Sequence, residues 1–204
     1  MSETGSHGSP PVETTVTPAK VAIHEPPDHD HEMESRPTLR GQRILLRAIN
    51  PDDRSALTAI LTEPEVARWW VHEDVATTVA GLFDDEDEVR LVIEIDGKVA
   101  GLIQFSEEDE PGYRHAGIDL FVARAWRGRG IGPDAIRFVA RHLFEERGHH
   151  RLVIDPAVEN ERAIRAYEKV GFRRVGVMRQ YEREVDGTWH DGLLMDLLAG
   201  ELRS

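Results

Sequence analysis

A glycine-rich turn between a strand and a helix is the feature that most constrains the fold. The apolar run before it, Ile118 to Ala123, has the composition of a buried strand. In the stretch after it, from Asp134 to Arg147, apolar residues recur at helical spacing. The chain therefore joins the end of a strand to the start of a helix through three glycines. The turn has the sequence Arg127-Gly128-Arg129-Gly130-Ile131-Gly132.

This turn is suited to binding phosphate. Glycine lets backbone N–H groups approach an anion closely, and a helix N-terminus adds partial positive charge. Arg127 and Arg129 add full charges that suit phosphate. The spacing of the glycines differs from the dinucleotide fingerprint, and the Lys-Ser/Thr ending of the NTPase phosphate loop is absent. The turn therefore predicts a diphosphate site of another kind, and a plain turn that caps a helix is the alternative.

The N-terminal segment differs in composition from the rest of the chain. Residues 1–36 are rich in Pro, Thr, Ser, Glu and His and almost lack large apolar side chains. Such a segment buries too little apolar surface to offset its ordering entropy. We therefore expect a disordered tail over residues 1–36 and a folded domain over residues 37–204. The run Asp28-His29-Asp30-His31-Glu32 is interpreted as solvated charge, and no metal site is predicted.

Composition excludes several classes of protein. The chain of 204 residues has no cysteine, which excludes a disulfide framework, a thiolate nucleophile and a cysteine metal site. Its net charge of −13 argues against nucleic acid as a partner and is compatible with a cationic substrate. No apolar run approaches the length of a membrane span, and no signal-peptide core is visible. We expect a soluble cytoplasmic protein, monomeric or homodimeric.

The folded part alternates strand and helix patterns in the order β-α-α-β-β-β-α-β-α-β-β, which predicts an α/β domain with helices on the faces of a mixed sheet. Two Asp-Gly pairs, at 96–97 and 186–187, indicate hairpins, and acidic loops are expected at 84–88 and 107–110. Strands are expected at 44–49, 91–95, 99–105, 151–155, 172–185 and 188–198, and a further strand ends at 123. Helices are expected at 50–61, 64–70, 75–83, 134–147 and 160–170.

A second motif follows, from Asn160 to Phe172, with the sequence Asn-Glu-Arg-Ala-Ile-Arg-Ala-Tyr-Glu-Lys-Val-Gly-Phe. It is similar to the Asn-x-x-Ala-x-x-x-Tyr-x-x-x-Gly-Phe signature of the GNAT acetyltransferase superfamily. Arg127-x-x-Gly130-x-Gly132 resembles the acetyl-coenzyme A loop of the same superfamily. Together with the order of elements, the resemblance covers residues 43–199. It implies the GNAT fold, a mixed and mostly antiparallel sheet of about seven strands, splayed at the centre, with helices on both faces.

The resemblance also implies acetyl-coenzyme A as co-substrate. Asn160, Ala163 and Tyr167 share one helical face. Asn160 suits a hydrogen bond to the pantetheine arm, the small Ala163 lets the cofactor lie close, and Tyr167 can protonate the leaving thiolate as a general acid. A core tyrosine is the alternative role for Tyr167. The expected cofactor-binding residues are Phe121, Val122, Arg127, Gly128, Arg129, Gly130, Ile131, Gly132, Asn160, Ala163 and Tyr167.

Asp119 is the candidate general base. Strand alternation turns it to the side opposite Ile118 and Leu120. A carboxylate within an apolar strand needs a partner, and an incoming ammonium group would supply one and lose its proton to it. A structural ion pair with one of the many arginines is the alternative.

Shorter matches are found at Trp69-Trp70, Gly101-Leu102-Ile103-Gln104, Gly117-Ile118-Asp119, Asp155-Pro156 and in the helix from Arg162 to Lys169. They resemble the aminoglycoside 6'-N-acetyltransferases within the superfamily. Carboxylates suit the ammonium groups of such a drug, and tryptophan can pack on a sugar or a cation. Core packing is the alternative for one of the two tryptophans, and ending a strand is the alternative for Asp155. Pro133 and the 107–110 loop depart from the pattern. The implied acceptor-binding residues are Trp69, Trp70, Gln104, Asp119 and Asp155.

These observations predict direct acetyl transfer, in a ternary complex, to the 6'-amino group of an aminoglycoside. With no cysteine, no covalent enzyme intermediate is expected. An alternative acceptor is N-hydroxylysine or a protein N-terminus, which requires a cation in the cleft. No clear basic cluster is visible outside Arg127–Arg129. A non-catalytic coenzyme A-binding module is the third hypothesis.

Overall fold

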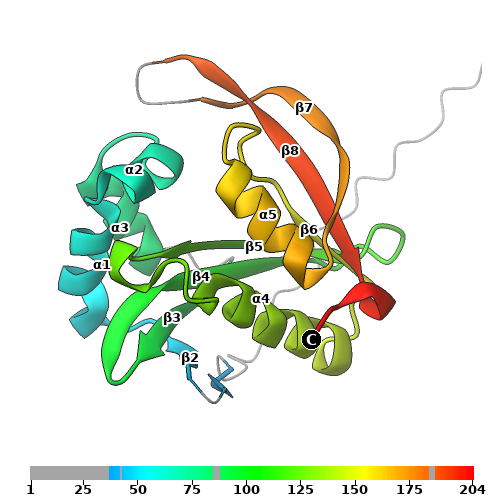
Figure 1. Ribbon diagram of the computed structural model, residues 1–204, viewed down its shortest axis with the longest axis horizontal. Helices are drawn as coiled ribbons and strands as arrows, with labels where there is room; N and C mark the ends of the chain where they lie inside the picture. Colours follow the sequence, from blue (N-terminus) through cyan, green and yellow to red (C-terminus); the bar gives the residue numbers. More distant parts are fainter. Residues whose placement is uncertain (1–36, 42, 85–87, 184–186) are drawn as a thin grey trace, which may run out of the picture. The chain divides into compact units, whose positions relative to one another are not determined.

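The computed structural model describes residues 37–204 except 42, 85–87 and 184–186. The predicted disordered tail lies outside the described residues, as do parts of the acidic loop at 84–88 and of the turn at 186–187. Within the described part, the strands form one sheet of eight in the order β1-β2-β3-β4-β5-β6-β8-β7, and all neighbours are antiparallel except β5 and β6 (Figure 1). The predicted mixed, mostly antiparallel sheet is confirmed.

The elements follow the predicted order closely. The strands are β1 (Leu39–Arg40), β2 (Leu45–Ala48), β3 (Val89–Ile95), β4 (Lys98–Glu108), β5 (His115–Val122), β6 (Arg151–Ile154), β7 (Arg173–Arg183) and β8 (Trp189–Leu198). The α-helices are α1 (Arg54–Leu61), α2 (Pro64–Trp70), α3 (Val75–Asp84), α4 (Ile131–Arg141) and α5 (Glu161–Val170). Shorter helical turns are η1 (Pro51–Asp53), η2 (Arg124–Trp126), η3 (His142–Glu146) and η4 (Ala199–Glu201).

The structure differs from the predicted elements in three places. The strand β1 was missed because its two residues are too few to show a periodic pattern, and it brings the number of strands in the sheet to eight. Glu107 and Glu108 belong to β4 rather than to a loop, because they pair with the start of β5. Helix α4 begins at Ile131 rather than Asp134, and its last turn, η3, is a π-helix.

The sheet divides between β5 and β6. These two strands pair only at Ala116 with Leu152 and at Gly117 with Val153. Strand β5 then continues to Val122. The two strands therefore separate beyond Gly117, and the predicted splay at the centre of the sheet is confirmed.

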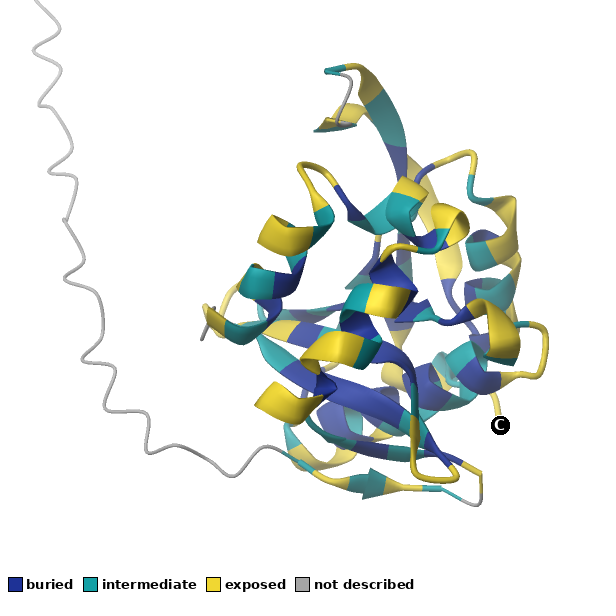
Figure 2. Cartoon of the chain, turned by 90° about the vertical axis from the view of Figure 1, so that its left-hand side faces the viewer, coloured by how far each residue is buried: buried dark blue, intermediate teal, exposed yellow. Residues whose placement is uncertain are grey.

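Successive residues of β5 serve two different apolar cores. Ile118 and Leu120 pack with apolar side chains of α4 and α5, whereas Phe121 packs with side chains of α1, α2 and α3. Helices therefore cover both faces of the sheet, α1–α3 on one and α4–α5 on the other, and Figure 2 shows the buried residues between sheet and helices. This alternation places Asp119 on the same side of β5 as Phe121.

Local signals explain why several elements begin and end where they do. The Asn50 side chain accepts a hydrogen bond from Asp52 N–H, and Asp53 accepts one from Asn50 N–H, so a capping box starts the predicted helix. Asp96 and Gly97 both have positive φ, 49° and 71°, as a two-residue hairpin turn requires. No helix in the described part of the chain is long and apolar enough to cross a bilayer.

Gly171, which ends α5, is expected to be essential for stability. Its φ is 125°, and an added Cβ would lie 2.3 Å from the carbonyl oxygen of Glu201. We expect Gly171→Ala to lower the free energy of unfolding by about 2–3 kcal/mol, measured by urea denaturation. Gly81→Ala is the matched control, because Gly81 lies in α3 with open space around it. A loss below about 0.5 kcal/mol for Gly171→Ala would contradict this account.

Candidate active site

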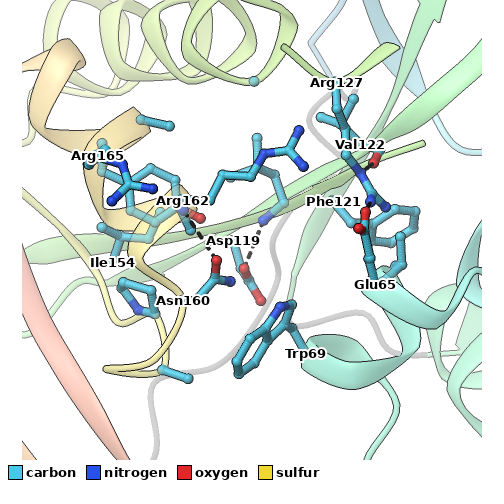
Figure 3. Close-up of a pocket in the computed structure, with 18 of the residues that line it drawn as sticks. Glu65, Trp69, Asp119, Phe121, Val122, Arg127, Ile154, Asn160, Arg162 and Arg165 are labelled. Carbon is cyan, nitrogen blue, oxygen red and sulfur yellow. Dashed lines mark hydrogen bonds and ion pairs between the residues drawn. The ribbon is translucent and has the colours of Figure 1, made fainter. Parts of the chain in front are cut away.

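A cavity of about 900 Å³ lies where β5 and β6 separate (Figure 3). Its walls come from α2, the end of β5, the glycine turn, the end of β6, α5 and β7. Most residues predicted to form the site line this one cavity, and the exceptions are Arg129 and Gln104. The predicted residues that line it are Trp69, Trp70, Asp119, Phe121, Val122, Arg127, Gly128, Gly130, Ile131, Gly132, Asp155, Asn160, Ala163 and Tyr167.

The glycine turn has the backbone conformation that an anion site needs. Gly128 and Gly130 have φ of 75° and 83°, a region that side chains disfavour. Helix α4 starts directly after them, and the first N–H groups of a helix have no partner within it. At Gly132 an added Cβ would only touch Leu120 and Val122 at ordinary distances, so protein packing does not require a glycine there. These features fit a diphosphate group held against backbone amides.

The two arginines of the turn, Arg127 and Arg129, already interact with other protein groups. The Arg127 Nε donates a hydrogen bond to the Val122 carbonyl at 2.7 Å, and its two Nη atoms pair with Glu63 and Glu65. Its guanidinium therefore ties the glycine turn to the start of α2. Arg129 lies over the Trp126 ring, 5.3 Å from its centroid, and does not line the cavity. We infer that the turn contributes amides rather than arginine charge to the cavity.

Apart from Arg127 and Arg68, four basic residues line the cavity, and the sequence analysis missed them. The expectation of no basic cluster outside Arg127–Arg129 was wrong, because α4 and α5 bring their side chains to the same cavity. The spacing of three and four residues along α5 was a usable signal, since it puts three of these bases on one helical face. The four residues are Arg137, Arg162, Arg165 and Lys169.

Asn160, which was predicted to bind the pantetheine arm, caps helix α5. Its Oδ1 accepts a hydrogen bond from Ala163 N–H at 3.2 Å, drawn dashed in Figure 3. This leaves the side-chain NH₂ to donate into the cavity. The proposed hydrogen bond to a pantetheine amide would then run from this NH₂ group to a carbonyl oxygen.

Asp119 lies at the floor of the cavity (Figure 3). The Asp119 side chain is exposed to this cavity, whereas its neighbours Ile118 and Leu120 are buried. Desolvation by the surrounding protein raises the pKa of Asp119 to about 8. A hydrogen bond from the Leu120 N–H, 2.8 Å from Oδ1, opposes part of this shift, and the charges of Asp155, Glu182 and Glu88 add to it. Within the described residues no arginine pairs with Asp119, which removes the alternative of a structural ion pair.

Tyr167 is buried next to this carboxylate. Its ring packs against that of Phe172, with the two ring centroids 6.2 Å apart. Burial raises the pKa of its hydroxyl far above the ordinary value, and the charges of Asp119 and Asp155 add to the shift. The hydroxyl therefore stays protonated at any working pH and is able to donate a proton or a hydrogen bond.

Strand β7 supplies two residues that the sequence analysis missed. Pairing with β8 is irregular between Met178 and Glu182, Gln180 has a φ of 51°, and its N–H donates to the Asp191 carboxylate at 2.8 Å. This bulge lets the neighbours Tyr181 and Glu182 both line the cavity, although successive strand residues normally face opposite sides. No local sequence pattern marks such a bulge.

Tyr181 orients one of the predicted acceptor ligands. Its hydroxyl donates a hydrogen bond to the Asp155 carboxylate, and this bond, together with partial burial, raises the pKa of Tyr181 to about 12. Asp155 follows the last residue of β6 and lines the cavity. Asp155 therefore has a partner that fixes its carboxylate.

The two tryptophans have different surroundings: Trp70 packs against the core, and Trp69 lies in the cavity wall. Trp70 packs edge-on against Phe121, with ring centroids 4.7 Å apart, and joins the core under α1–α3. Trp69 lies in the cavity wall, with the Arg68 guanidinium 4.3 Å from its ring centroid (Figure 3). Trp69 is therefore the better candidate to contact an acceptor.

Gln104 is not brought into the cavity. It is the cross-strand neighbour of Asp119, but its Oε1 accepts a hydrogen bond from the buried Arg90 at 3.3 Å. Its predicted contact with the acceptor therefore gains no support from the geometry.

The fold and this cavity define an acyl-coenzyme A-dependent transferase, and comparison with known proteins identifies the class. Residues 53–172, more than half of the chain, match the acetyltransferase (GNAT) family, so the chain belongs to this family. It is an acetyltransferase that acts on amines, and acetyl-coenzyme A is its co-substrate. The predicted superfamily, fold and co-substrate are confirmed.

The relatives act on different amines. An aminoglycoside N(6')-acetyltransferase type 1 from Klebsiella pneumoniae is 28% identical over 161 residues, which cover 69% of this chain and 79% of the relative. The spermidine N(1)-acetyltransferase of Escherichia coli (strain K12) is 25% identical over 158 residues, which cover 74% and 84%. The solved structure of Mycobacterium smegmatis RimJ in complex with CoA-disulfide has a TM-score of 0.72 at 26% identity and covers 83% of this chain and 90% of that chain.

Proposed function

We propose that the protein acetylates a small polycationic amine, and that the 6'-amino group of an aminoglycoside is the first candidate. The observation that carries this proposal is the group of carboxylates at one end of the cavity. Asp119, Asp155 and Glu182 all line it, and they lie close enough for the last two to raise the pKa of the first. Such a group binds several ammonium groups better than one.

A linear polyamine is the second candidate. The spermidine acetyltransferase is nearly as similar to this chain as the aminoglycoside enzyme, and both act on molecules with more than one ammonium group. Trp69 supports the aminoglycoside, because a flat aromatic face suits a sugar ring as well as a cation. N-hydroxylysine and a protein N-terminus stay as alternative acceptors.

The chain supplies both proton-transfer groups for the reaction. When bound, acetyl-coenzyme A supplies an acetyl thioester activated for attack by an amine. The Asp119 carboxylate accepts a proton from the acceptor ammonium, which leaves a neutral nucleophile. The Tyr167 hydroxyl, kept protonated by its surroundings, donates a proton where the thiolate leaves. The glycine turn and Asn160 would hold the diphosphate and the pantetheine arm.

The rate should depend on pH through Asp119. The base must be ionised to act, and its pKa is about 8. We therefore expect kcat/KM to rise about tenfold per pH unit below pH 8 and to level off above it. Because the acceptor amine also titrates, the profile of Asp119→Asn is the control, and it should lack this ionisation. A wild-type profile identical in shape to that of the variant would contradict the assignment.

A screen of acceptors tests the proposed function. Kanamycin, tobramycin, spermidine, N-hydroxylysine and a peptide with a free N-terminus would be compared at saturating acetyl-coenzyme A by release of thiol, and the product of each active acceptor mapped by mass spectrometry. We expect turnover with the polycations and acetylation of the 6'-amino group of the drugs. Turnover of the peptide or N-hydroxylysine alone would support the alternative acceptors. Tight binding of coenzyme A with no turnover would support the non-catalytic module.

A further inference from the structure

A contact between His72 and Glu182 joins two walls at the end of the cavity that holds the carboxylates. His72 follows the last residue of α2 by two positions, and Glu182 lies on β7. The Nε2 atom of His72 is 3.1 Å from Oε1 of Glu182, which makes an ion pair when the imidazole is protonated. Residues of α2 and β7 both line the cavity, and strands β7 and β8 run toward α2 in Figure 1. His72 itself does not line the cavity, so it acts on a ligand there through Glu182.

Glu182 needs a partner to keep its carboxylate in the cavity. Its strand, β7, is an edge of the sheet and is mostly exposed, and the Glu182 side chain is 35% exposed. The charge of Glu182 raises the pKa of Asp119, so the two carboxylates are close enough to repel each other, and Asp155 lines the same cavity. This repulsion favours a Glu182 side chain that turns outward to water. A contact with the segment after α2 opposes that movement.

His72 is itself held in place from both sides along the chain. Val71, directly before it, is buried in the core under α1–α3. Asp74, two residues after it, caps α3, because its Oδ1 accepts the N–H groups of Ala76 and Thr77 at 2.8 and 3.0 Å. The short segment that carries His72 is therefore anchored at both ends, and the imidazole is a fixed partner for a side chain on β7.

The contact leaves Glu182 able to bind a cation. A carboxylate has two oxygens, each of which accepts more than one hydrogen bond, and His72 approaches one of them. Because a carboxylate has no proton to donate, Nε2 must carry the proton that faces it, which both the neutral and the charged imidazole allow. A carboxylate that is fixed before the ligand arrives loses less conformational entropy on binding than a free one.

We propose that His72 is a positioning residue for the acceptor: it keeps the Glu182 carboxylate in the cavity, where that carboxylate binds a second ammonium group while Asp119 takes the proton of the first. This inference rests on the polycationic acceptor of the proposed function. The two side chains of the pair are 43% and 35% exposed, and exposed pairs contribute little to stability. The role of His72 is therefore in acceptor binding rather than in folding.

Steady-state kinetics of His72→Leu at pH 7 test the inference. We expect the KM of kanamycin and of spermidine to rise about tenfold, with kcat changed by less than about threefold and the KM of acetyl-coenzyme A unchanged. The midpoint of urea unfolding should stay that of the wild type. His150→Leu, which removes an exposed histidine that does not line the cavity, is the matched control and should keep all wild-type constants.

A double-mutant cycle shows whether His72 acts through Glu182. Glu182→Ala should raise the KM of the acceptor at least as much as His72→Leu does. Adding His72→Leu to Glu182→Ala should then change this KM by less than about twofold, because the carboxylate that His72 positions is gone. Losses that multiply in the double variant would overturn the inference. A wild-type or lower acceptor KM in His72→Leu would also overturn it, the lower value because His72 would then compete with the ammonium group.

The outcomes separate this inference from the function on which it rests. Turnover of kanamycin or spermidine by the wild type, together with any of the contrary results above, would overturn the role of His72 and leave the proposed function intact. Failure of the wild type to acetylate any polycation would overturn the proposed function, and the inference with it.

Discussion

Asp119→Asn should lower kcat/KM by about 100-fold or more, because it removes the group that accepts the proton of the acceptor ammonium. The change keeps the size of the side chain and its position on β5, where Oδ1 accepts the N–H of Leu120. Fold and coenzyme A binding should therefore be retained, as judged by circular dichroism and calorimetry. The measurement is steady-state release of thiol with the best acceptor from the screen.

Asp155→Asn is the matched control for this prediction. Asp155 lines the same cavity and is hydrogen-bonded by Tyr181, but in our account it holds the acceptor and does not take its proton. Its replacement should raise the KM of the acceptor more than it lowers kcat. Similar losses of kcat in the two variants, or a loss below tenfold for Asp119→Asn, would contradict the assignment of Asp119 as the base.

Tyr167→Phe should lower kcat by about 100-fold through loss of the general acid, while the KM values of both substrates change little. The phenyl ring keeps its contact with Phe172, so the packing of the core is preserved. Only the hydroxyl group is lost, and no other described tyrosine is both buried and near Asp119. Single-turnover rates with pre-bound acetyl-coenzyme A would show whether the chemical step is the one affected.

Tyr181→Phe provides the comparison. It removes the same atom from another tyrosine of the same cavity, and its hydroxyl is committed to Asp155. We expect a change below about tenfold, mostly in the KM of the acceptor. If Tyr181→Phe were the more damaging of the two, the proton donor would have to be reassigned to β7.

The cavity also explains how one site handles opposite charges. Asp119, Asp155 and Glu182 come from β5, the end of β6 and β7, and most of the bases come from α4 and α5. Glu65, Arg68, Glu159 and Glu161 also line the cavity. The acceptor cation and the anionic co-substrate can therefore each contact side chains of opposite charge, although the chain as a whole has a net charge of −13. Electrostatic complementarity of this kind favours correct orientation of both substrates.

Several features could be predicted because they depend on neighbours in the sequence. The helix start at Asn50, the turn at Asp96-Gly97 and the alternation around Asp119 are all local. Each was found where the pattern placed it, since side-chain caps and turn conformations involve residues only a few positions apart.

Other features depend on residues that are distant in the sequence. Arg127 could be assigned a phosphate role from its position, but its partners Glu63 and Glu65 lie more than 60 residues away. Arg137 is positioned by the carbonyl of Arg203, and Gln104 by Arg90 across a strand pair. No periodicity reports such pairings, because they form only when the sheet and helices have packed.

The sequence by itself determined the strand, glycine turn and helix that form the co-substrate site, because glycine conformations, helix caps and strand alternation are set by short-range sterics and hydrogen bonds. Only the tertiary structure decided which charges reach the cavity. The bulge at Gln180 directs Tyr181 and Glu182 inward, and the packing of α4 beside α5 brings Arg137, Arg162, Arg165 and Lys169 to one cavity. Both depend on contacts between elements far apart in the chain, and the energies of such contacts are not encoded in any one stretch of residues.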